Sequence, residues 1–152
     1  MIQRIQTVFL SVALIFTALF ILFPFGEVAV NEKIYTFSIL GIVDAVTGKT
    51  VYPAWYLSVF TGIILLLQVI IIFSYKKRKR QIRFALFTIL LLVVFVLGCW
   101  LFARLSAKSL GDGIYSFKLS MVFPFLSIFF NYLAILAIRR DDTLVKSIDR
   151  IR

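Results

Sequence analysis

Four long apolar stretches constrain this chain more than any other feature of its sequence. They cover approximately residues 5–23, 54–75, 84–103 and 119–138. An α-helix rises 1.5 Å per residue, so roughly 20 residues cross a hydrocarbon core about 30 Å thick. In lipid the backbone has to satisfy its own hydrogen bonds, which makes such segments helices. The sequence therefore predicts an all-α membrane protein, a four-transmembrane-helix bundle formed as a single domain by residues 1–152.

Composition supports lipid as part of the solvent. Hydrophobic residues make up 62% of the 152 positions, whereas soluble domains have roughly 45–50%. A water-soluble chain of about 150 residues buries only about 70% of its unfolded surface. Such a domain would leave too much apolar surface in water, so we interpret the chain as membrane-embedded.

The first apolar stretch has a second interpretation as a cleaved signal peptide, because Arg4 precedes it. An apolar signal core has about 7–15 residues and ends at a small-x-small cleavage site. This stretch is longer, and Phe23, Pro24 and Phe25 stand where that site would lie. We therefore expect a membrane span.

The basic residues predict the orientation. Twelve of the 17 lie at the N-terminus, in the linker of residues 76–83 or in the tail of residues 139–152, and five lie in the other two connections. Lys and Arg are retained on the cytoplasmic side of membranes. Both termini and the linker are therefore predicted to be cytoplasmic. In the tail, Leu144, Val145, Ile148 and Ile151 share one helical face, which predicts a short amphipathic helix that lies on the surface or extends the fourth span.

The two predicted extracytoplasmic loops differ in character. Residues 26–53 are rich in β-formers, with turn signals at Asn31-Glu32 and Thr47-Gly48, and predict a small antiparallel meander that caps the bundle. The second loop, residues 104–118, contains Gly111-Asp112-Gly113 and too little apolar sequence for more than a turn.

Few residues offer catalytic or metal-binding chemistry. Histidine is absent, Cys99 is the single cysteine, and no nucleotide-binding or hydrolase motif occurs. We therefore predict no enzyme activity, no cofactor, no metal site and no nucleic-acid partner. A membrane enzyme would require the loop carboxylates to converge, namely Glu27, Glu32, Asp44 and Asp112.

Two groups of polar residues are candidates for contacts. The linker has six cations that serve topology or contact anionic lipid or an acidic partner: Lys76, Lys77, Arg78, Lys79, Arg80 and Arg83. Inside the spans, Gln68 and Asn131 lie at similar depth, and we predict that they hydrogen-bond to each other or to Ser11.

Both ends of the chain carry a family resemblance. The start MIQRIQT (residues 1–7) and the end IRRDDTLVKSIDRIR (residues 138–152) resemble a family of small bacterial membrane proteins catalogued as a domain of unknown function. The resemblance implies a multi-pass protein of the bacterial inner membrane with four helices. It implies no activity, cofactor or catalytic residue.

Two functions remain open from the sequence. The first is a non-enzymatic interaction or scaffold protein that contacts membrane lipids or other membrane proteins through its basic segments. The alternative is a subunit of a transporter or a small channel. A channel requires a polar cavity lined by Gln68, Asn131, Thr61 and Ser127, and the spans contain no ionisable residues of the kind that coupled carriers use.

Overall fold

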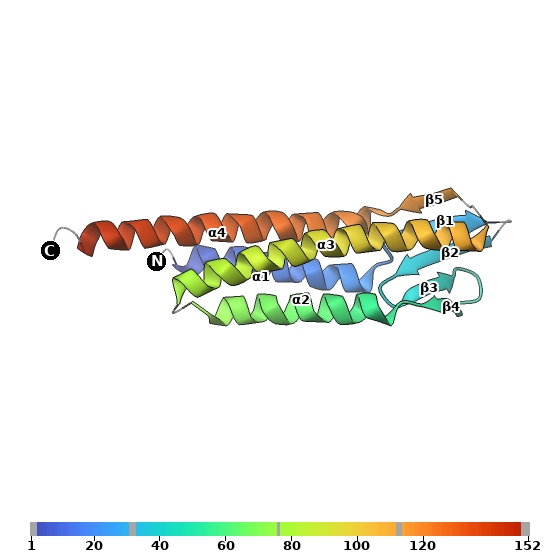
Figure 1. Ribbon diagram of the computed structural model, residues 1–152, viewed down its shortest axis with the longest axis horizontal. Coiled ribbons are helices and arrows are strands. Elements are labelled where there is room, and N and C mark those ends of the chain that lie inside the picture. Colours follow the sequence, from blue (N-terminus) through green and yellow to red (C-terminus); the bar gives the residue numbers. More distant parts are fainter. Residues whose placement is uncertain (1–2, 31–32, 76, 112–113, 150–152) are drawn as a thin grey trace.

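The computed structural model describes residues 3–30, 33–75, 77–111 and 114–149, with the backbone alone at residues 3–4, 142 and 144–149. Four helices follow one long axis: α1 (Gln3–Leu22), α2 (Trp55–Phe73), α3 (Arg78–Leu110) and α4 (Val122–Asp149). In Figure 1, the start of α1, the end of α4 and the connection between α2 and α3 lie at one end. The strands lie at the other end.

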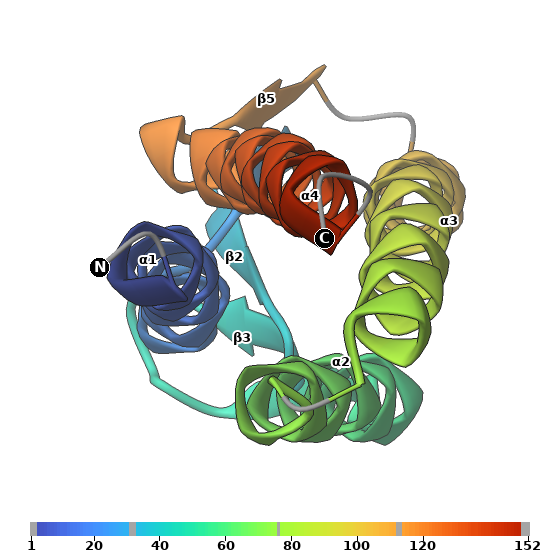
Figure 2. The same cartoon turned by 90° about the vertical axis from the view of Figure 1, so that its left-hand side faces the viewer.

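The helices form a ring of four. Viewed along the long axis in Figure 2, α1 lies between α2 and α4, and α3 lies opposite α1 between the same two neighbours. Only 28–33% of the residues in their apolar windows are buried. Many of the remaining apolar side chains are exposed on the outer surface, and a monomer in water does not expose apolar surfaces of that size. Four helices are thus long and apolar enough to span a membrane.

A five-stranded antiparallel sheet stands at the other end of the bundle. Its strands are β1 (Gly26–Val30), β2 (Lys33–Ser38), β3 (Gly41–Asp44), β4 (Thr50–Pro53) and β5 (Ile114–Phe117), in the order β4-β3-β2-β1-β5. Strand β1 pairs on both sides, so that Val28 lies opposite Tyr35 of β2 and Tyr115 of β5. The sheet is thereby built from both connections at this end of the helices.

The predicted all-α fold class is therefore wrong. The chain folds into a helical bundle with a true sheet, and β1 to β4 come from the segment between α1 and α2. That meander alone would leave one edge of β1 without hydrogen-bond partners. Strand β5, from the connection between α3 and α4, pairs with that edge.

The prediction that residues 104–118 form no more than a turn is also wrong, because this segment contains the end of α3 and strand β5. Helix α3 continues beyond Ala103 to Leu110, because Ser106 and Ala107 are buried. Gly111, with φ of +121°, follows the helix, and β5 begins at Ile114. Asp112 and Gly113 of the predicted turn lie outside the described residues.

Phenylalanine rings join the bundle to the sheet. The Phe25 side chain is fully buried, and its ring centroid lies 5.8 Å from that of Phe20 in α1, 6.1 Å from that of Phe37 in β2 and 6.4 Å from that of Phe102 in α3. Its backbone N–H donates to the Phe37 carbonyl at 2.8 Å, and its carbonyl accepts from Lys118 N–H at 3.0 Å. Phe25 therefore connects helices and strands through both its ring and its backbone.

The ends of two helices differ from the predicted bounds. The predicted linker is helical from Arg78 onward, so four of its cations lie in the first two turns of α3, and Lys76 lies outside the described residues. Helix α4 continues to Asp149, so the tail extends the fourth helix. Ile151 and the side chains of Leu144, Val145 and Ile148 lie outside the described part of the chain.

Candidate functional site

Cations crowd the start of α3. Lys77 precedes the helix, and Lys79, Arg80 and Arg83 are exposed in its first two turns. This end of a helix carries the positive end of the macrodipole, where anions are favourable and cations are not. No acidic residue lies in the first turn of α3, and no side chain caps it. The local potential therefore favours an anion from outside the chain.

Arg78 differs from its neighbours because α4 supplies an anion for it. Its Nη2 lies 3.8 Å from Asp141 Oδ2, and its Nη1 donates to the Asp141 carbonyl at 3.3 Å. Gln6 Nε2 of α1 donates to the same carboxylate at 2.9 Å. Among the described side chains, Lys77, Lys79 and Arg83 have no ion pair. Three helices thus share one internal charge pair, and the other cations stay uncompensated.

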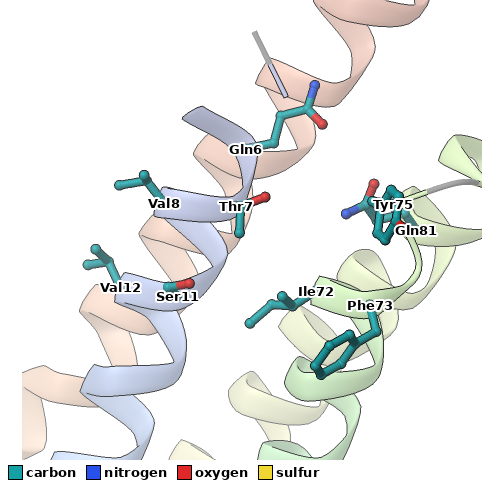
Figure 3. A pocket seen from close by; sticks show the side chains of 9 residues that line it. All are labelled: Gln6, Thr7, Val8, Ser11, Val12, Ile72, Phe73, Tyr75 and Gln81. Atoms are coloured by element: carbon teal, nitrogen blue, oxygen red, sulfur yellow. The ribbon is translucent and has the colours of Figure 1, made fainter. Parts of the chain in front are cut away.

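A pocket of about 610 Å³ opens between α1 and α2 at this basic end (Figure 3). Its walls combine apolar and polar side chains from α1, α2 and the start of α3: Gln6, Thr7, Val8, Ser11, Val12, Ile72, Phe73, Tyr75 and Gln81. Ligand pockets typically enclose about 300–1,000 Å³. The volume and the mixed lining are therefore suited to an amphiphilic molecule.

Gln81 presents a hydrogen-bond acceptor without a partner. It is only 3% exposed, and its Nε2 donates to the Ile71 carbonyl at 3.2 Å. A carbonyl accepts but cannot donate, so the amide has to turn its nitrogen toward Ile71. Gln81 Oε1 is consequently turned away, and it is buried without a hydrogen-bond partner among the described residues.

A second polar cluster lies deeper in the bundle. Gln68 Nε2 donates to Thr17 Oγ1 at 3.1 Å and to Ser127 Oγ at 3.0 Å. Asn131 Nδ2 donates to the Ser127 carbonyl at 2.9 Å, and Ser127 Oγ donates to the Ala13 carbonyl at 2.9 Å. The cluster therefore links α1, α2 and α4 through Ser127.

Gln68 and Asn131 meet at Ser127 and not at each other. Gln68 Oε1 and Asn131 Oδ1 have no partner among the described residues, so neither amide accepts a hydrogen bond from the other. Ser11 lines the pocket near the basic end instead. The sequence reasoning did not identify Thr17 as a partner of Gln68. The i, i+4 spacing of Ser127 and Asn131 on one helical face was a signal for the contact between those two residues.

The loop carboxylates do not converge. Glu27 pairs with Lys118 at 2.9 Å. Asp44 Oδ1 accepts from the N–H of Val46 at 2.8 Å and that of Thr47 at 3.2 Å, and these backbone bonds lower the pKa of Asp44 below its usual value. Strand β2 separates the strands that carry the two acids, and Glu32 and Asp112 lie outside the described residues. The two described loop carboxylates therefore serve an ion pair and a turn.

Comparison with known families identifies the chain. A family model described as "Domain of unknown function (DUF4293)" matches residues 2–151. The chain belongs to this family. The resemblance predicted from its two ends is thus confirmed. No curated protein matches the chain, so a function for this DUF4293 member has to be argued from its geometry.

The buried cluster allows a stability prediction that separates packing from function. We expect Gln68→Met to change the free energy of unfolding by less than about 1 kcal/mol, because it removes an unpaired buried oxygen together with the two donated bonds. Ser127→Leu should destabilise by about 1–3 kcal/mol, because the larger side chain overpacks the point where α1 and α4 meet. Unfolding by SDS titration in mixed micelles measures both. A decrease in the free energy of unfolding as large for Gln68→Met as for Ser127→Leu would contradict this account.

Proposed function

We propose that this DUF4293 member is a non-enzymatic protein of the bacterial inner membrane that crosses the bilayer four times and works by contacting anionic lipid at its basic end. The outward apolar faces of all four helices support the membrane location, since only lipid solvates such surfaces favourably. A role in holding other membrane proteins is compatible with the same basic surface.

The orientation follows from the helix count and the basic residues. An even number of spans places both termini on one side, and the connection between α2 and α3 lies at that same end (Figure 1). In the sequence, the two terminal segments and this connection contain twelve of the 17 Lys and Arg residues of the chain. Because cytoplasmic segments retain cations, we assign this end to the cytoplasm.

The uncompensated cations at the start of α3 carry the functional proposal. Lys77, Lys79 and Arg83 have no ion-pair partner among the described side chains, and they lie where an apolar helix emerges from its span. Anionic headgroups of the cytoplasmic leaflet lie at that level. Each basic residue near such a leaflet contributes about 1 kcal/mol, so lipid phosphates supply the missing counter-charge.

The buried polar residues favour this proposal over a channel. Gln68, Asn131, Thr61 and Ser127 are all buried, and they hydrogen-bond to one another or to helix backbone. None of them lines the pocket between α1 and α2. They are typical of interhelical packing in membranes.

A charge-matched pair of variants tests the proposal. The triple variant Lys77→Gln, Lys79→Gln, Arg83→Gln removes three cations from the basic end, and Lys33→Gln, Lys49→Gln, Lys108→Gln removes three from the sheet end. Both proteins are extracted in polymer nanodiscs from vesicles of phosphatidylcholine with a tenth of phosphatidylglycerol, and the co-extracted lipid is quantified by mass spectrometry. We expect anionic enrichment around the wild type and the sheet-end variant, and a loss of about 3 kcal/mol at most in the basic-end variant.

Two outcomes would contradict the proposal. Equal enrichment around the wild type and the basic-end variant would show that these cations do not recruit lipid. Equal losses in both variants would show an effect of net charge alone and not of the basic end.

A further inference from the structure

We propose that the pocket between α1 and α2 binds one phospholipid that has an anionic phosphodiester and a hydrogen-bond-donating headgroup, as phosphatidylglycerol has. This inference rests on the proposed function, because it assigns part of the general lipid contact to one defined site. It adds a position, a stoichiometry and a headgroup chemistry.

The apolar part of the pocket suits an acyl chain that enters from the side. Val8 and Phe73 stand at its mouth and are 56% and 74% exposed. Val12 of α1 and Ile72 of α2 also line the pocket, and Ile72 points toward α1 in Figure 3. Val8 and Phe73 are exposed on the outer apolar surfaces of α1 and α2, so a lipid chain beside these helices reaches the pocket without crossing water.

The polar part of the pocket suits a headgroup. Gln6 and Thr7 lie on the α1 side, and Tyr75 and Gln81 lie across the opening on the α2 and α3 side (Figure 3). Lys77 follows Tyr75 by two positions and is exposed. Gln81 lies in the first turn of α3, so a phosphodiester above this opening would lie near the positive end of that helix.

Gln81 sets the headgroup chemistry. Its nitrogen is committed to the Ile71 carbonyl, and its buried Oε1 lacks a donor among the described residues. A buried acceptor without a partner is destabilising, and a ligand that donates to it removes that penalty. Gln81 lines the pocket, so a turn of its side chain toward the opening brings Oε1 within reach of the glycerol hydroxyls of phosphatidylglycerol, which can donate such a bond. Phosphatidylmethanol has the same charge and an anionic phosphodiester, but its methyl ester has no donor.

Native mass spectrometry of the full chain in detergent tests the site. Dioleoyl phosphatidylglycerol and dioleoyl phosphatidylmethanol are titrated separately and in competition. We expect one tightly bound lipid per wild-type chain and a preference for phosphatidylglycerol of about two- to tenfold, which is the value of one hydrogen bond. Equal affinities for the two lipids would overturn the headgroup assignment without any variant being needed.

Pocket variants test the position. Ser11→Phe and Val8→Trp fill the cavity without changing charge, and we expect each to weaken the single bound lipid at least about tenfold, as loss of an apolar site does. Ile15→Trp adds the same ring at an exposed position of α1 that does not line the pocket, and it should bind like the wild type. Val8 is exposed, so its variant keeps the test valid if Ser11→Phe does not fold. Binding by Val8→Trp equal to that of Ile15→Trp would overturn the site.

Two further measurements separate a hydrogen bond to Gln81 from general binding of anions. Gln81→Met should bring the ratio of the affinities for phosphatidylglycerol and phosphatidylmethanol close to one. Gln68→Met removes an amide that is buried away from the pocket, and it should leave this ratio unchanged. Dissolved glycerol phosphate at the lipid's concentration should not compete, and equal competition would show a free-anion site. If Val8→Trp loses the single bound lipid but keeps the enrichment of anionic lipid in nanodiscs, lipid binding in the pocket is independent of the lipid contact proposed for the basic end.

Discussion

Phe25→Ala is expected to destabilise the protein by about 3–5 kcal/mol, the usual loss for removal of a buried phenylalanine ring. The Phe25 ring is fully buried among three other phenylalanine rings from α1, β2 and α3. Its removal leaves a cavity at the joint between the bundle and the sheet. Thermal unfolding followed by the fluorescence of Trp55 and Trp100, both near this joint, measures the change.

An exposed ring provides the control for Phe25. Phe125 of α4 is 55% exposed on the outer surface of the bundle, so Phe125→Ala should change the free energy of unfolding by less than about 1 kcal/mol. If Phe25→Ala costs no more than Phe125→Ala, the joint does not depend on this ring. In that case the sheet would be attached mainly by its backbone hydrogen bonds.

Gly41→Ala should be about as damaging, for a steric reason. Gly41 has φ of +141°, and a Cβ added there would lie 2.2 Å from the Tyr52 carbonyl oxygen and 3.0 Å from Ala54 N. Those atoms belong to the backbone of β4 and of the residue before α2, and they cannot rotate away. We expect a loss of roughly 3–5 kcal/mol from backbone strain and overlap together, with faster amide hydrogen exchange in β3 and β4.

Gly48 is the matched control for this substitution. It also has positive φ, at +66°, but an added Cβ would meet nothing within 4 Å. Gly48→Ala should therefore lower the free energy of unfolding only by the cost of holding alanine in the left-handed conformation, which is about 1–2 kcal/mol. Similar losses for Gly41→Ala and Gly48→Ala would show that conformation alone matters and that the predicted clash with Tyr52 is relieved.

Much of the helical architecture was predictable because it depends on local sequence. Apolar runs of spanning length specify helices wherever the solvent is lipid, and all four predicted runs lie within or largely within helices. The β-rich character of residues 26–53 followed from their β-branched and aromatic residues and turn signals, and they form four strands. The predicted helix ends were wrong where a helix continues beyond its apolar run. Helix α3 extends from Arg78 to Leu110, whereas its apolar run covers residues 84–103.

The site was only partly predictable. The cations of residues 77–83 are evident in the sequence, but the pocket beside them joins residues 6–12, 72–75 and 81, which no sequence spacing relates. Asp141 was visible as a charge in the tail, yet its contacts with Gln6 and Arg78 depend on how three helices pack. Polar residues inside spans indicate partners but do not name them, since the interhelical register selects among several hydroxyls.

The sequence by itself determined that four stretches are long and apolar enough to span a membrane as helices, and it determined which segments carry the cations. Only the tertiary structure decided that strands from both connections join in one five-stranded sheet. The free edge of β1 pairs with residues 114–117, which lie 85 to 91 positions farther along the chain. Such pairing depends on where two connections emerge from the bundle, and that position is a property of helix packing and not of either segment.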